Sequence, residues 1–368
     1  MLGLYRKLLL RARNPLPASG PVFGSVALGQ ATAYFQWLNF AIGEAPPGRE
    51  PLILNMDETS ICRHVGGLRG TVAQVTSGRP MPKDSASLAQ RRCNISYIAC
   101  IAHDAAVQPQ LPQVLLGNEH QFTKELLRSL VGKVPPNVSI WRQRSAWNSH
   151  ATMRQWLSLL SKALGPLMQN RYVVLLLDVH ASHIDSSIFL HARRCGVRLV
   201  YIPAKMTALL QPCDAHVFAM FKMAFRKAWR EKKARAVSGN VSTGQWLQAV
   251  FAAIQSTMAR TTVQKAFLSD GVLENQAQMS ENLRSQLDLP QTLSPVPPSA
   301  EAAACIFPAR AKVDVLSYVL WQPKCRRAQS TRHAASSSSA GAQPTVARRV
   351  LPASFQFGKK RQLIRTLD

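Results

Sequence analysis

Three aspartates lie where a predicted strand ends or a predicted helix begins. Asp57 ends the short apolar strand in PLILNMDETS, Asp178 ends the apolar run RYVVLLLD, and Asp214 opens a long helix. Adjacent strands that end in Asp bring their carboxylates to one edge of a sheet, where open α/β sheets bind ligands. Crowded carboxylates repel one another, and divalent cations such as Mg²⁺ or Mn²⁺ relieve that repulsion. A pair of such cations stabilises the attacking and leaving oxygens when a phosphodiester is displaced.

Each aspartate also has an ordinary interpretation. Asp214 could cap its helix, since Asp is a favoured N-cap residue, and Asp57 and Asp178 could simply end their strands. The 368 residues contain 19 Asp and Glu against 45 Lys and Arg, a formal charge of +26. Because acids are so scarce, the placement of three aspartates at strand ends and a helix start favours a shared site over three ordinary positions. A chain this basic attracts phosphate polyanions, nucleic acid first and an anionic membrane surface second.

The overall composition excludes several classes of protein. Hydrophobic residues make up 46% of the chain and charged residues 17%, which excludes a wholly disordered or collagen-like protein. No apolar run approaches the roughly 20 residues of a membrane span. The seven cysteines form no CxxC pair, so reduced thiols in an intracellular protein are expected rather than a disulfide framework or a zinc ribbon.

The elements around the second and third aspartates predict a parallel pair of strands. RYVVLLLD reads as a central buried strand, and VRLVYIP as a second buried strand. The segment between them reads as a helix that starts near Asp185 and ends at Gly196. Strand, helix and strand in this order form a βαβ unit, so the two strands are expected to be parallel.

The other elements are less regular. A strand is predicted to begin at Asn94, and the residues 107–116 predict an edge strand interrupted by proline. The residues 120–164 show helical periodicity.

The long helix after Asp214 carries a basic face. Its seven cations, against the single acid Glu231, favour contact with DNA phosphates over an ordinary solvated helix face. The predicted DNA-binding residues are Lys222, Arg226, Lys227, Arg230, Lys232, Lys233 and Arg235.

Three segments of the sequence resemble the catalytic blocks of the DDE superfamily endonucleases. They are NMDET around Asp57, LLLDVHASH around Asp178, and YIPAKMTALLQPCDAHVFAMFKMAFRKAW around Asp214, and TTVQKAFLSDGVL is similar to the helical segment that follows the core. The resemblance covers about residues 50–275 and is greatest to the pogo, Tigger and jerky-type transposases and their domesticated relatives. The LLQPxD core of the third block is its most specific part.

The resemblance implies an α/β protein with an RNase H-like mixed sheet flanked by helices, and metal-dependent cleavage and joining of DNA. It implies that Asp57, Asp178 and Asp214 hold two Mg²⁺ or Mn²⁺ ions. His183 matches a His common in the second block, and His183 and His180 are candidate auxiliary residues. Glu58, the neighbour of Asp57, is expected to point to the other side of its strand and not to be a ligand.

Four regions are expected from the resemblance and from the changes in composition. The residues 1–47 form an N-terminal helix and linker with truncated or absent DNA-binding modules, and 48–236 form the RNase H-like catalytic domain. The residues 237–288 form a C-terminal helical extension, and 289–368 a disordered basic tail.

Two departures from the family keep an alternative function open. The family usually has Asn directly after its second Asp, where this chain has Val179. Most relatives also carry N-terminal helix-turn-helix modules, and nothing in the residues 1–47 resembles two such modules. A catalytically inactive, domesticated or decayed relative that binds nucleic acid is therefore the alternative to an endonuclease. DNA is the expected partner, a membrane is not, and a homodimer is an open alternative to a monomer. The nucleus is the expected location, with an organelle as the alternative if the acid-free N-terminus is a transit peptide.

Overall fold

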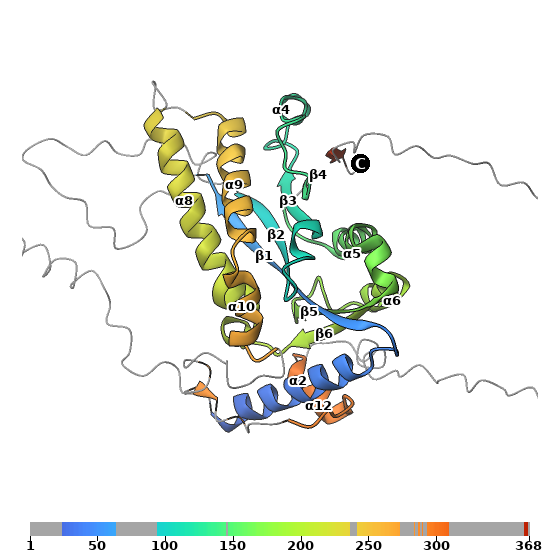
Figure 1. The fold of residues 1–368 in the computed structure, drawn as a ribbon. Coiled ribbons are helices and arrows are strands. Elements are labelled where there is room, and N and C mark those ends of the chain that lie inside the picture. The colour runs from blue at the N-terminus through green and yellow to red at the C-terminus, as the bar shows by residue number, and fades with distance from the viewer. Residues whose placement is uncertain are drawn as a thin grey trace, which may run out of the picture. The chain divides into compact units, whose positions relative to one another are not determined.

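The protein is built around a mixed β-sheet, seen in a computed structural model (Figure 1). The structure describes residues 24–63, 94–144, 146–235, 241–272, 283, 286, 287, 289, 293–308 and 364–366. All of them belong to one unit, which comprises Met1–Leu320 and Gln362–Asp368. The strands are β1 (Glu50–Cys62), β2 (Asn94–Ala102), β3 (Gln113–Asn118), β4 (Val138–Gln143), β5 (Arg171–Asp178), β6 (Val197–Ile202) and β7 (Ile364–Thr366).

The strand order places the first and second predicted blocks side by side. The order is β6-β5-β1-β2-β3-β4-β7, and β1 is parallel to β5 and antiparallel to β2. β5 is also parallel to β6, as the βαβ prediction requires. The apolar runs of β1 and β5 are almost wholly buried because helices cover both faces of the sheet. The expected mixed α/β sheet flanked by helices is thus confirmed.

Two groups of helices lie on opposite sides of the sheet (Figure 1). One group follows β6 and consists of α8 (Phe218–Arg235), α9 (Thr243–Met258) and α10 (Thr262–Ser269). It packs through aromatic side chains, with the Phe221 ring 4.8 Å from the Tyr97 ring of β2. The other group consists of α5 (His150–Leu164) and α6 (Ser186–Arg194), and a short α4 (Lys124–Ser129) precedes β4.

The helix α6 begins and ends where the sequence predicts. Asp185 is its N-cap and accepts a hydrogen bond from the Ser187 backbone N–H at 2.9 Å. Gly196 follows the helix with a positive φ of 70°, a conformation that favours glycine. The β5-α6-β6 unit is therefore confirmed.

The predicted N-terminal helix is part of the packed core. α2 (Ser25–Gly43) buries Trp37, whose ring stacks on Tyr201 of β6 with a centroid distance of 6.2 Å. Its buried side is broad, with Tyr34, Phe35 and Leu38 at most 2% exposed. The helix predicted within 1–47 is thus present at Ser25–Gly43 and packs into the core. The residues 1–23, on which the transit-peptide alternative rests, lie outside the described residues.

A short segment of the expected disordered tail is folded. The residues 293–308 include α12 (Ala300–Ile306), which packs on α2, and Asn39 of α2 donates a side-chain hydrogen bond to the Leu293 carbonyl at 2.9 Å. The Phe307 ring lies 5.1 Å from Tyr201. The prediction of disorder from 289 onward is wrong for this segment because its few apolar residues cover α2 and β6. The residues 309–363 lie outside the described part.

Two predictions for the region between β2 and β5 are wrong in part. Within 120–164 the helical periodicity is confirmed by α4 and α5, but the strand β4 between them was not predicted. The residues 107–116 do not form an edge strand, because β3 pairs with β2 on one side and with β4 on the other. The prolines of this region lie before the strand, in a short 3-10 helix (Gln108–Gln110) and at Pro112.

Candidate active site

The first two aspartates lie on neighbouring parallel strands at the same level. The β1–β5 pairing includes Asn55 opposite Leu176, and Asp57 and Asp178 each follow two residues later. Asp178 is the last residue of β5, as predicted. Asp57 lies within β1, which continues to Cys62, and it does not end the strand as expected.

A buried amide joins the third block to the first two. Asn55 is 0% exposed, and its side-chain Nδ2 donates to the Leu176 carbonyl of β5 at 3.1 Å. Its Oδ1 accepts the Cys213 backbone N–H at 2.9 Å. One side chain therefore fixes the residue before Asp214 against the two strands that carry the other aspartates.

Asp214 lies in a turn of wide helix and does not act as a cap. The residues Cys213–Val217 form a π-helix that continues into α8, and Pro212 precedes it without any side-chain capping bond. π-Helical turns inside longer helices occur frequently at functional sites. The Asp214 side chain is exposed. The N-cap interpretation of Asp214 therefore does not hold, and its carboxylate is free to take another role.

The three aspartates interact electrostatically through Asp57. Burial raises the pKa of Asp57 well above its ordinary value, and the negative charges of Asp214 and Asp178 raise it further. Asp57 is 7% exposed, and within the described residues its buried Oδ2 has no hydrogen-bond partner. The structure thus holds a buried carboxylate oxygen with two other carboxylates nearby, an arrangement that a cation stabilises.

A buried histidine compensates the charge of the second aspartate. His183 is 2% exposed, its Nδ1 lies 2.5 Å from Asp178 Oδ1, and the Tyr201 hydroxyl donates to its carbonyl at 2.8 Å. Burial lowers the pKa of His183, but the hydrogen bond to Asp178 and the nearby carboxylate charges outweigh it and raise the pKa to about 10. Burial likewise raises the pKa of Asp178, yet His183 outweighs it and holds that pKa below the ordinary value. The pair is therefore charged at neutral pH.

Glu58 is linked to the aspartates through the same histidine. His183 Nε2 lies 3.7 Å from Glu58 Oε1, too far for a good hydrogen bond but close enough for an ion pair. Asn148, which precedes α5, donates its side-chain N–H to the same oxygen. Glu58 therefore has its partners near α5, while Asp57 interacts with Asp214 near α8. The contact between Glu58 and His183 could not be predicted, because β-strand alternation gives no information about the loop that follows β5.

The other candidate auxiliary residue has a local role. The His180 backbone N–H donates to Asp178 Oδ1 at 3.3 Å, and the His180 ring lies 2.8 Å from the Ser182 hydroxyl. The His180 side chain is exposed. Between the two, Val179 is half-buried and packs against the hydrophobic core. Of the two histidines, His183 is the one in side-chain contact with a predicted metal ligand.

The helical segment that follows the core supports the third block. His216, in the π-helix, lies 2.7 Å through Nε2 from Oδ1 of Asp270, which comes directly after α10 and is 1% exposed. The hydrogen bond with Asp270 raises the pKa of His216 above its ordinary value. α10 is thereby tied to the turn that carries Asp214.

The donor set suits a hard divalent cation, although the side chains do not enclose one as they stand. Mg²⁺ and Mn²⁺ prefer carboxylate oxygens, and the unpartnered Oδ2 of Asp57 beside two more carboxylates fits such an ion. Among the residues that the structure describes, no three His, Cys, Asp or Glu side chains are grouped closely enough to hold a metal ion. Asp214, being exposed, is the member with most freedom to move toward the other two.

The predicted basic face lies on α8, directly after the π-helix. Lys222, Lys227, Arg230, Lys233 and Arg235 are exposed, while Arg226 and Lys232 are half-buried. Lys222 lies over the Phe218 ring at 5.9 Å and Lys233 over Trp229 at 5.6 Å, which holds their stems along the helix. In the described part of the chain, none of the seven cations forms an ion pair with a carboxylate. No described carboxylate therefore neutralises the charge of these seven side chains.

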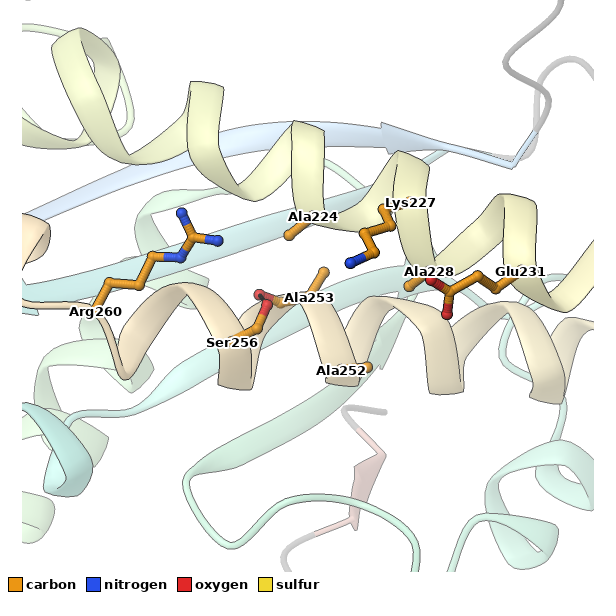
Figure 2. Close-up of a pocket in the computed structure, with 8 residues that line it drawn as sticks. All are labelled: Ala224, Lys227, Ala228, Glu231, Ala252, Ala253, Ser256 and Arg260. Carbon is orange, nitrogen blue, oxygen red and sulfur yellow. Dashed lines mark hydrogen bonds between the residues drawn. The ribbon is translucent and has the colours of Figure 1, made fainter.

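A hollow of about 280 Å³ extends this face from α8 to α9 (Figure 2). Lys227 of α8 and Arg260, which follows α9, both reach into the space between the helices, and the small residues Ala224, Ala228 and Ala253 leave it open. Arg260 is exposed and adds a cation that the sequence does not mark out, while the carboxylate of Glu231 also lines the hollow. No helix of the described residues is long and apolar enough to cross a membrane.

Part of the chain matches a known protein family. The residues 97–271 match the family described as DDE superfamily endonuclease, a range that contains Asp178 and Asp214 and begins after Asp57. The sequence matches no curated protein.

Solved structures of the Mos1 transposase are similar to the chain. The Mos1 mariner paired-end complex with Mn is 16% identical with a TM-score of 0.36, over 73% of this chain and 70% of that one. The Mos1 catalytic domain with raltegravir and Mg is 14% identical with a TM-score of 0.32, over 68% and 97%. The catalytic domain of Mos1 mariner transposase is 15% identical with a TM-score of 0.31, over 68% and 96%.

Proposed function

We propose that the sheet and its helices form a DDE-type endonuclease and strand-transfer domain that acts on DNA phosphodiesters with two divalent cations. The observation that carries this proposal is the buried, unpartnered carboxylate oxygen of Asp57 beside Asp178 and Asp214. The match of residues 97–271 to the DDE superfamily endonuclease supports it, as does the basic face of α8 next to Asp214.

In this proposal each part of the site has a separate task. Asp57, Asp178 and Asp214 hold the cations, which when bound supply activation of water and stabilisation of the leaving oxygen. His183 orients Asp178 by keeping a proton on Nδ1, and it shields this carboxylate from Glu58. The lysine and arginine side chains of α8 bind the DNA phosphates and so place a phosphodiester at the edge of the sheet where the aspartates lie.

A plasmid-nicking assay tests the proposed reaction. With Mg²⁺ or Mn²⁺ the protein converts supercoiled plasmid to open circles, and a chelator stops the conversion. Asp178→Ala lowers the nicking rate by about 100-fold or more, because loss of metal-dependent charge stabilisation is worth several kcal/mol. Asp185→Asn is the matched control, since Asp185 caps α6 and Asn is an equally good cap. Nicking by Asp178→Ala at the rate of the unsubstituted protein would refute the assignment.

One observation favours a second candidate function, a nucleic-acid-binding protein without catalysis. Val179 provides no polar side chain next to Asp178 and instead packs against the hydrophobic core. DNA binding without cleavage under either metal selects this alternative. Absence of DNA binding eliminates both candidates.

The basic face of α8 leads to a prediction about salt dependence. Lys227→Ala with Arg230→Ala removes two exposed cations, so the slope of log K against log salt concentration becomes shallower by about 1.8. Fluorescence anisotropy of a labelled duplex at several salt concentrations measures this slope. Lys162→Ala with Arg194→Ala is the control, because these exposed cations lie on α5 and α6 across the sheet. Equal slopes for the two double variants contradict the placement of DNA on α8.

A further inference from the structure

The loop between β4 and α5 presents an exposed tryptophan. Trp147 is 79% exposed, more than any other large hydrophobic residue in the described part of the chain. Four other tryptophans, in α2, β4, α5 and α9, are at most 2% exposed. Surface apolar residues are common, but a bare indole forgoes the largest burial that any side chain offers.

The backbone on both sides of Trp147 is fixed. The Ala146 carbonyl accepts the Ser96 hydroxyl of β2 at 2.7 Å, and the Trp147 carbonyl accepts the Gln143 side chain of β4 at 2.7 Å. Ser149 then caps α5 by accepting the Thr152 N–H. Three hydrogen bonds therefore hold the backbone from Ala146 to Ser149, which limits the conformational freedom that Trp147 loses when a ligand stacks on it.

The same loop contacts the carboxylate cluster. Asn148, the next residue, donates to Glu58, and Glu58 pairs with His183, which is hydrogen-bonded to Asp178. β4 is parallel to β3 and ends at the same edge of the sheet as β5. Arg144, in the same loop, is exposed and adds a positive charge. An aromatic side chain and a cation thus follow a strand that ends at the edge of the sheet where Asp178 lies.

We propose that Trp147 is a stacking platform for an unpaired nucleobase of the DNA strand that enters the site. The inference rests on the proposed function and adds to it the form of the substrate, a strand end with splayed bases rather than an intact duplex. Aromatic side chains bind unpaired bases of any sequence through their π faces, whereas bases inside a duplex are already stacked. Arg144 contacts a phosphate of the same strand.

The test compares two DNA ligands at one salt concentration. A blunt duplex and the same duplex with a three-nucleotide single-stranded end that carries 2-aminopurine are titrated with protein, and anisotropy gives both affinities. The protein binds the splayed ligand between about 5-fold and 150-fold more tightly, and 2-aminopurine fluorescence is quenched on binding. Trp147→Ala loses both the preference and the quenching but binds the blunt duplex unchanged. Trp147→Phe keeps part of each.

Val131→Ala is the matched control because Val131 is 62% exposed and lies after α4. It leaves the preference for the splayed ligand unchanged. Failure of the unsubstituted protein to bind either ligand contradicts the proposed function. Binding to both ligands with an equal preference in Trp147→Ala and in the unsubstituted protein overturns the role of Trp147 and leaves the proposed function standing.

Discussion

Asp57→Asn is expected to lower the rate of DNA nicking strongly and, at the same time, to stabilise the fold. Its carboxylate is 7% exposed, lacks a partner for Oδ2 among the described residues, and lies beside two other carboxylates. Removal of its charge relieves that repulsion, and about 1 kcal/mol of relief raises the melting temperature by roughly 2–4 °C in a domain of this size. The same change removes a metal-binding oxygen, so nicking falls by about 100-fold or more. Thermal denaturation without metal and the plasmid assay measure the two effects.

The opposite signs of these effects distinguish a functional residue from a structural one. Asp104→Asn is the control, because Asp104 pairs with Arg171 at 2.9 Å outside the cluster. That substitution weakens an ion pair, so it lowers the melting temperature slightly and leaves nicking unchanged. Asp57→Asn with lower stability and unchanged nicking would show that Asp57 is an ordinary strand residue.

His183→Leu is expected to cause the largest loss of stability. The substitution leaves Asp178 and Glu58 without the cation between them, and both carboxylates are about one quarter exposed. Breaking a buried pair costs about 3–5 kcal/mol, and partial exposure of the carboxylates reduces this to about 2–3 kcal/mol. The melting temperature therefore falls by roughly 5–10 °C. Because a divalent cation would neutralise Asp178, added Mg²⁺ or Mn²⁺ raises the melting temperature of the variant more than that of the unsubstituted protein.

His180→Leu controls for loss of a histidine in the same loop. His180 is exposed and its ring contacts only the neighbouring Ser182 and the His183 ring among the described residues. Its substitution changes the free energy of unfolding by about 0.5 kcal/mol or less. Equal stability of His183→Leu and the unsubstituted protein contradicts the charge compensation assigned to His183.

The β5-α6-β6 unit could be predicted because each of its signals is local. A continuous apolar run, an N-cap aspartate and a C-terminal glycine each determine their own short segment, and the structure confirms all three. The juxtaposition of Asp57 with Asp178 follows from the same logic once β1 and β5 pair in parallel.

Other features depend on contacts between residues that are distant in the sequence. β4 was not recognised because its six residues lie between two helical segments and are specified by pairing with β3. The packing of α2 and α12 against β6 depends on Trp37, Tyr201 and Phe307 meeting across the fold. The role of Asn55 within the site could not be predicted for the same reason, since its two hydrogen-bond partners come from β5 and from the π-helix.

Binding of Mn²⁺ to the isolated protein tests the central claim, that three distant aspartates share divalent cations. Electron paramagnetic resonance measures the free ion during titration at a salt concentration that suppresses weak surface binding. The unsubstituted protein is expected to take up about two Mn²⁺ per chain, and Asp57→Asn, Asp178→Ala and Asp214→Ala each to lose that uptake. Uptake that none of the three substitutions reduces, or no uptake by the unsubstituted protein, would contradict a shared metal site.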